Sequence, residues 1–175
     1  MKITVISYSL TGNNEALAAK LASEFSAEHI KIVPVIPRTF GMIALDMLFN
    51  RVPKINPSVK HIAANNFIIF VAPVWMGKIA SPLRSCFEEL KKHQHQYAFV
   101  SISGGADGSN PKLESELEKK LGKKPAIVLD YHITDLLPSE PKPTRDDTSA
   151  YRLTEENTLA ITSQTVQNIQ ERLAN

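Results

Sequence analysis

The chain has 175 residues, a hydrophobic fraction of 43% and a formal net charge of +2. This length and composition suit one globular domain over residues 1–175 and exclude a disordered chain. Charges of both signs are interspersed, which argues against a nucleic-acid surface, and no apolar run approaches the ~20 residues that span a bilayer. The single cysteine excludes an intrachain disulfide and a multi-cysteine metal site, and we predict no metal.

The N-terminal residues lead directly into an apolar strand pattern and show no secretory signal. We therefore expect a cytoplasmic protein. The sequence gives no indication of the oligomeric state.

The first predicted elements are a strand over 2–7 and a helix over 13–26. The turn between them is Ser9-Leu10-Thr11-Gly12-Asn13-Asn14. N–H groups in the first turn of a helix attract anions, and the hydroxyl and amide side chains here add further donors. An ordinary turn with capping residues would also favour Ser, Thr and Asn. We favour a phosphate site at this turn.

The middle of the chain contains a second predicted strand over 29–35, an apolar helix over 39–50 and an irregular connector over 51–64. The run over 67–72, Phe-Ile-Ile-Phe-Val-Ala, is unbroken and apolar. Such a run is typical of a central strand that is buried on both faces.

The remaining segments continue the alternation of strands and helices. In order, they are a loop at Pro73–Lys78, a helix from Ser81, a strand over 97–101, a glycine-rich run over 103–109, a helix with leucines at 113, 117 and 121, a strand over 126–129, a proline-rich loop over 138–152 and a last helix from Thr154.

This alternation predicts an α/β fold, a doubly wound five-stranded parallel sheet between two helical layers. The dinucleotide motif G-x-G-x-x-G and the P-loop motif are both absent, which favours the flavodoxin-like strand order 2-1-3-4-5. In that order, ligands bind at the carboxyl ends of strands one and three. The turn over 7–14 and the loop over 73–78 lie there, with the loop after strand four beside them.

Three segments resemble the cofactor loops of flavodoxins. Ser9–Asn14 is similar to their phosphate loop, usually [ST]-x-T-G-N-T, although Asn14 stands where threonine is usual. Pro73–Gly77 is similar to the second loop, where a tryptophan commonly lies against the flavin. Ser103–Ser109 is similar to the third, whose backbone holds the pyrimidine edge of the ring.

The resemblance implies FMN as the cofactor. It also implies that Trp75 stacks on the isoalloxazine, and that Gly77 allows a peptide flip beside the flavin. The cofactor-binding residues so expected are Ser9, Leu10, Thr11, Gly12, Asn13, Asn14, Pro73, Val74, Trp75, Met76, Gly77, Ser103, Gly104 and Gly105. The redox chemistry would be that of the flavin, and no side chain is predicted to be a catalytic acid or base.

The third loop lacks the aromatic residue that covers the flavin in many flavodoxins, and the chain is not strongly acidic. Both features favour an oxidoreductase that passes electrons from NAD(P)H or a protein donor to a quinone or similar small acceptor. The alternative is a one-electron carrier that docks to redox partner proteins, and a third possibility is a protein of this fold that has lost its cofactor. The loop over 138–152 is either a lid, with Tyr151 or Arg145 reaching the site, or inert surface.

Overall fold

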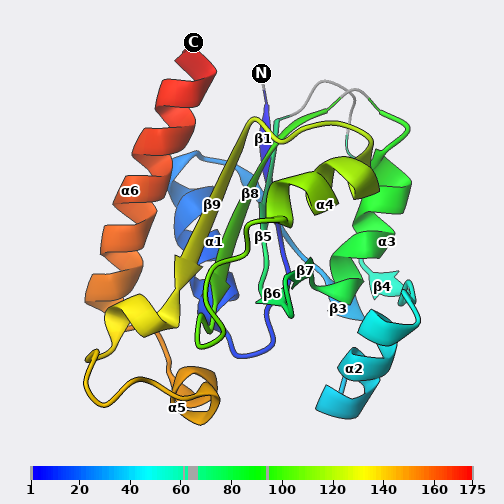
Figure 1. Ribbon diagram of the computed structural model, residues 1–175. Coiled ribbons are helices and arrows are strands. Elements are labelled where there is room, and N and C mark those ends of the chain that lie inside the picture. Colours follow the sequence, from blue (N-terminus) through cyan, green and yellow to red (C-terminus); the bar gives the residue numbers. More distant parts are fainter. Residues whose placement is uncertain (1, 61, 63–66, 94, 175) are drawn as a thin grey trace.

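The computed structural model describes residues 2–60, 62, 67–93 and 95–174 (Figure 1). Its centre is a five-stranded parallel sheet in the order β2-β1-β5-β8-β9, which confirms the predicted order 2-1-3-4-5. The strands are β1 (Ile3–Ser7), β2 (Glu28–Lys31), β5 (Phe67–Val71), β8 (Gln96–Ser103) and β9 (Ile127–His132).

Helices cover both faces of this sheet, which gives the predicted three layers. One face carries α1 (Asn13–Glu24) and α6 (Glu155–Ala174), and the other carries α3 (Ser81–Leu90) and α4 (Leu113–Leu121) (Figure 1). Alternate residues of β5 enter the two cores: Phe67 and Ile69 face α1, whereas Ile68 and Phe70 face α3. All of β5 is buried, as the unbroken apolar run predicts.

The predicted second strand, over 29–35, extends too far at its carboxyl end. β2 ends at Lys31, and Val33–Pro34 forms a separate strand, β3, that pairs antiparallel with β4 (Ile55–Asn56). Proline has no N–H for a further ladder bond, so Pro34 cannot extend the parallel pairing. The predicted connector over 51–64 therefore contains a short strand, and its residues 61, 63 and 64 lie outside the described part of the chain.

Two loops at the carboxyl ends of the strands have more structure than expected. The loop over 73–78 contains a tight hairpin of β6 (Val74–Trp75) and β7 (Lys78–Ile79), in which Met76 and Gly77 both have positive φ. The stretch before the last helix contains the 3₁₀ turn η1 (Ile133–Leu136) and helix α5 (Arg145–Ala150). α5 lies at the same end of the sheet as α2 (Phe40–Leu48), which is the predicted apolar helix (Figure 1).

A capping box explains α5. The Thr144 hydroxyl accepts from the Asp147 N–H, and the Asp147 carboxylate accepts from the Thr144 N–H. The Thr144 hydroxyl, which donates to the Asp147 carboxylate at 2.6 Å, and the Thr144 N–H hold the pKa of Asp147 below its usual value. Within the described residues, no helix is long and apolar enough to cross a membrane.

Candidate functional site

The turn after β1 leads into α1 at Gly12, which has φ +96° and supplies no side-chain cap. Ser9 Oγ accepts a hydrogen bond from the Gly12 N–H at 3.0 Å, which closes the turn. A Cβ at Gly12 would meet no atom within 4 Å, so the glycine is required by its φ and the space beside it is open. An uncapped helical turn with open space before it has the geometry of an anion site.

Asn13 and Asn14 do not direct their amides to this space. The Asn13 amide donates to the Tyr151 carbonyl at 3.1 Å and accepts from the Leu153 N–H at 3.0 Å. The Asn14 amide donates to the Ile102 carbonyl at 2.7 Å and accepts from the Ile102 N–H at 2.9 Å. Both side chains, which we expected to help hold a phosphate, instead hold neighbouring backbone.

The indole of Trp75 lies between the two halves of the site. It is half-buried in the β6–β7 hairpin, and the ring of Tyr8 meets it edge-on at 5.7 Å between centroids and 86° between planes. Burial raises the pKa of Tyr8; the charge of Arg38 opposes this shift, and the carboxylate of Asp46 adds to it. The Tyr8 side chain therefore stays neutral, and its ring contact helps to fix the orientation of Trp75.

The loop after β8 is anchored by one carboxylate, that of Asp130 in β9. Asp130 accepts from Asn110 Nδ2 at 2.8 Å and lies 3.0 Å from His132 Nε2 and 3.4 Å from Ser103 Oγ. The start and the end of the glycine-rich run are thereby tied to the edge strand. Between these two ties, the Gly108 N–H donates to the Gly105 carbonyl at 2.9 Å, which makes a turn at the centre of the loop.

Two glycines of this loop stand where a side chain would collide. A Cβ at Gly104 would lie 2.9 Å from Thr148 Oγ1 in α5. Gly105 has φ +80°, and its Cβ would lie 2.6 Å from the Cβ of His132. The loop therefore needs glycine because α5 and β9 approach its backbone closely.

Two pockets adjoin at the carboxyl ends of β1, β5 and β8. One, of about 560 Å³, extends from the α1 turn and is lined by Thr11, Asn14, Ser149 and Arg152 among others; we call it the turn-end pocket. The other, of about 400 Å³, extends over the hairpin and the glycine-rich loop, and we call it the ring-end pocket. Both are lined by Leu10, Val74, Trp75, Ser103, Gly104 and Thr148.

Most of the predicted site residues meet in these two pockets. Of the predicted set, Ser9, Gly12 and Asn13 line neither pocket, and they form the turn behind the turn-end pocket. Together the pockets suit an elongated ligand with an anionic group at the α1 turn and a flat ring beside Trp75.

The α5 segment supplies two lining residues that were not predicted from the sequence: Thr148 lines both pockets, and Arg152 lines the turn-end pocket. Arg145, which the sequence analysis considered, lines the ring-end pocket. Of the two side chains considered for a lid, Arg145 reaches the site, whereas the Tyr151 hydroxyl donates to Asn157 at 2.6 Å. The sequence signal for α5 was the capping box Thr144-x-x-Asp147, which marks a helix start.

An ion pair joins α5 to the glycine-rich loop at the mouth of the ring-end pocket. Arg145 donates from Nε and Nη2 to Asp107 Oδ1 at 3.1 and 2.8 Å, and these contacts raise the pKa of Arg145. Among the described residues, no group of three or more His, Cys, Asp or Glu side chains is placed to hold a metal ion.

Comparisons with known proteins agree with this arrangement. A family model described as NADPH-dependent FMN reductase matches residues 1–122. A flavoprotein from Lactobacillus acidophilus NCFM, solved in complex with FMN, superposes with a TM-score of 0.62 at 23% identity, covering 74% of this chain and 92% of that one. A candidate flavoprotein from Bacteroides uniformis ATCC 8492 gives 0.61 at 15% identity, with coverage of 85% and 95%. No curated protein matches the sequence significantly.

Proposed function

The chain belongs to the NADPH-dependent FMN reductase family, and we propose that it uses bound FMN to pass electrons from NAD(P)H to a quinone or a similar small acceptor. The resemblance to flavodoxins thus holds for the fold and the cofactor, while the family is that of the FMN reductases. FMN, when bound, supplies the reversible uptake and release of electrons.

The observation that carries the proposal is the meeting of the uncapped α1 turn, Trp75 and the glycine-rich loop at two adjoining pockets. We infer that the phosphate lies at the N–H groups of the first turn of α1, with the hydroxyl of Thr11 as a further donor and Ser9 closing the turn behind it. Arg152 lines the same pocket and would add a positive charge. The amides of Asn13 and Asn14 support the turn from behind.

The ring would lie in the ring-end pocket, beside Trp75 and the backbone of Ser103–Gly105. An aromatic contact of this kind contributes roughly 1 kcal/mol beyond the buried area. Gly77 has φ +70° and would allow its peptide to turn toward the ring.

The shape of the ring-end pocket supports a small electron acceptor. Gly104, Gly105 and Ala106 put no large side chain over the pocket, so a small molecule can approach the ring directly. For the alternative of a carrier docking to a basic protein, an acidic rim is expected, yet the charged residues that line this pocket are the Arg145–Asp107 pair.

Trp75 is the one tryptophan of the chain, so its fluorescence reports on the site alone. We expect FMN to quench that fluorescence at one equivalent, and the loaded protein to oxidise NADPH when a quinone is added. Trp75→Leu should weaken FMN binding about tenfold, measured by flavin fluorescence. Phe49→Leu, which changes an exposed aromatic of the segment after α2, serves as the matched control.

The proposal is contradicted if excess FMN does not quench the Trp75 fluorescence and the protein is colourless after free FMN is removed. A loaded protein that passes electrons only to other proteins, and not to quinones, contradicts the small acceptor.

A further inference from the structure

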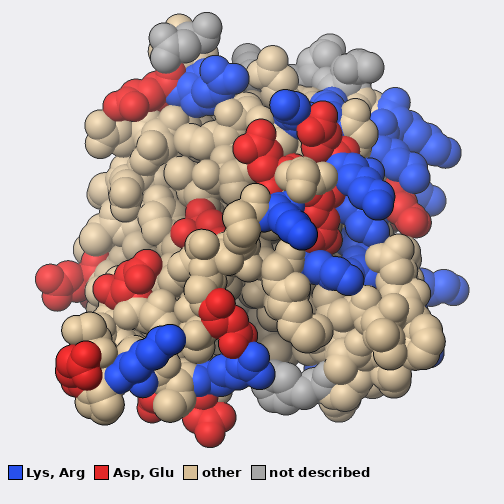
Figure 2. All heavy atoms as spheres, viewed as in Figure 1, with Lys and Arg blue, Asp and Glu red and all other residues tan. Residues whose placement is uncertain are grey.

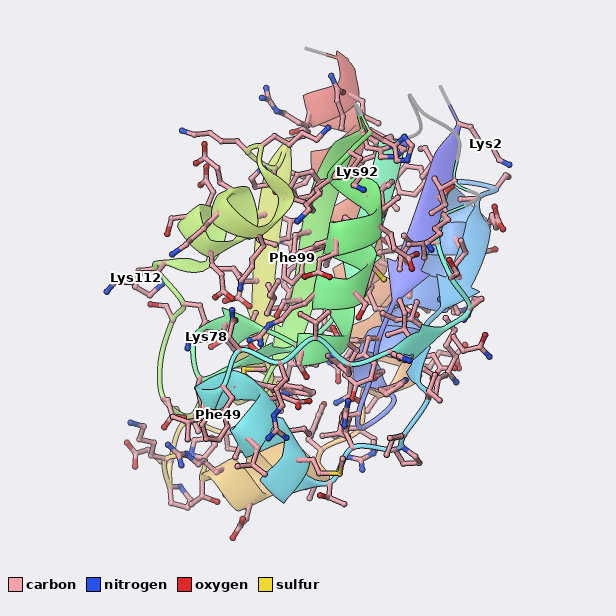
Figure 3. The ribbon with its side chains drawn as sticks, turned by 90° about the vertical axis from the view of Figure 1, so that its right-hand side faces the viewer. Lys2, Phe49, Lys78, Lys92, Phe99 and Lys112 are labelled. Atoms are coloured by element: carbon pink, nitrogen blue, oxygen red, sulfur yellow. The ribbon has the colours of Figure 1, made fainter. Side chains whose placement is uncertain are left out.

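A third pocket, of about 770 Å³, opens beside the ring-end pocket and is rich in lysine. Lys78, Lys112, Lys119 and Lys120 line it, and we call it the lysine pocket. Figure 2 shows basic side chains gathered over the part of this face formed by α3 and α4. Figure 3 shows Lys78 and Lys112 on the same side of the molecule.

The lysine pocket is continuous with the proposed redox site. It shares lining residues with the ring-end pocket, from the tip of the hairpin and from the end of the glycine-rich loop: Met76, Gly77, Asp107, Gly108 and Asn110. A ligand that occupies both pockets would therefore place one end beside the ring and the other among the lysines.

Positive charge exceeds negative charge in this pocket. Its carboxylates are Asp107, which Arg145 already pairs, and Glu116. Burial raises the pKa of Glu116, while a hydrogen bond with the Ile79 backbone and the charges of Arg84, Lys120 and Lys78 lower it. Burial lowers the pKa of Lys120; the charges of Arg84, Lys119 and Lys78 lower it further, and that of Glu116 opposes them.

Helix dipoles explain only part of this cluster. Lys119 and Lys120 lie in the last turn of α4, where a cation is favourable. Lys112 is the N-cap residue of the same helix, where a cation is unfavourable, and Lys78 comes from the hairpin. Four lysines from the hairpin and from α4 with its N-cap thus line one pocket, whose carboxylates are Asp107 and Glu116.

We propose that the lysine pocket binds the phosphate groups of a phosphorylated co-substrate whose redox-active end enters the ring-end pocket. This inference rests on the proposed function. The phosphates could belong to a nicotinamide dinucleotide or to a phosphorylated acceptor, since the shared chemistry is a multiply charged phosphate. Ammonium groups bind such anions as point charges, and binding weakens as salt increases.

The test uses FMN-loaded protein and calorimetric titration with two probes, adenosine 2′,5′-bisphosphate and inorganic pyrophosphate. FMN loading is established first from the flavin spectrum, so that a failure of the proposed function is recognised separately. The variant Lys112→Gln with Lys119→Gln removes two exposed charges from the pocket. The matched control, Lys20→Gln with Lys124→Gln, removes two exposed charges elsewhere.

We expect probe affinity to fall about tenfold in the pocket variant and to be unchanged in the control. Glu116→Gln should tighten binding several-fold, since it removes the competing carboxylate. A bisphosphate that binds tenfold or more tightly than pyrophosphate indicates the dinucleotide as the source, and similar affinities indicate a phosphorylated acceptor.

Loaded protein that binds neither probe with a Kd below about 10 mM overturns the inference. So does an equal loss of affinity in the pocket variant and the control, or a Glu116→Gln variant that binds the probes more weakly.

Discussion

Asn14 of α1 and Ile102 of β8 exchange two hydrogen bonds, one from the amide to the carbonyl and one from the N–H to the amide oxygen. Asn14 is 2% exposed, and Ile102 is also 2% exposed, so water cannot replace either bond. The pair fixes the α1 turn against the strand that leads into the glycine-rich loop. These hydrogen bonds thereby fix the position of one end of the proposed flavin site relative to the other.

Replacing Asn14 by threonine tests whether Asn14 supports the fold or binds the phosphate. Threonine cannot span both backbone groups of Ile102, so we expect the apoprotein to lose about 2–4 kcal/mol of unfolding free energy. Urea denaturation without FMN measures this loss. Asn168→Thr, which removes the hydrogen bond from the Asn168 side-chain amide to the Gln164 carbonyl within α6, should cost less than about 1 kcal/mol. Unchanged apoprotein stability in Asn14→Thr would show that the pairing is unimportant.

Gly104 and Thr148 should show strong coupling in a double-mutant cycle. A Cβ at Gly104 meets Thr148 Oγ1 at 2.9 Å, so Gly104→Ala must shift the Thr148 side chain or α5, and it should cost about 1–3 kcal/mol and weaken FMN binding. Thr148→Ala removes that oxygen and should restore most of the loss in the double variant. Gly41→Ala, where a Cβ meets nothing, should be neutral or stabilising. Additive losses would rule out the contact.

The Arg145–Asp107 ion pair should affect the kinetics of FMN binding more than stability. Both side chains are largely exposed, and such pairs contribute little to folding. Since they connect α5 to the loop across the pocket mouth, Arg145→Gln should raise the FMN dissociation rate in low salt. Stopped-flow measurement should find that the wild-type rate approaches that of the variant as salt increases. A difference in rate that persists at high salt would mean that the charge is not its cause.

His29 should make stability depend on pH. It lies 2.8 Å from Ser7 Oγ, and burial lowers its pKa below the ordinary 6.5. Between the two pKa values the unfolded chain binds a proton that the folded chain does not, so stability is retained above about pH 6.5 and is lost as the pH falls through the folded-state pKa. His29→Gln should reduce this slope in denaturation curves across that range. His93→Gln, at an exposed position, should leave it unchanged.

Much of the fold follows from local pattern. The unbroken apolar run over 67–72 favoured a central strand, and the absence of dinucleotide glycines favoured the observed strand order. The split of the second strand was not predicted, because Pro34 marks where the parallel pairing can end but not the long-range pairing of Val33 with Asn56. Thr144 and Asp147 did carry a signal for α5 that a proline-rich context obscured.

That these loops meet at one end of the sheet was predictable from the sequence, but the direction of their side chains was not. Polar residues at a helix start can face a ligand or the protein, and sequence spacing does not distinguish the two. Asn13 and Asn14 face the protein because residues 102 and 151–153 happen to pass within hydrogen-bond distance. That proximity depends on how α5 and β8 pack, which no local motif encodes.

The hydrogen bonds between Asn13 and the segment before α6 have a consequence for synthesis on the ribosome. Its partners Tyr151 and Leu153 lie 138 and 140 positions further along. The turn to which we assign the phosphate is thus translated long before the segment over 151–153 that supports it. We expect a nascent chain that lacks this segment to retain the flavin poorly, so that cofactor uptake follows its translation.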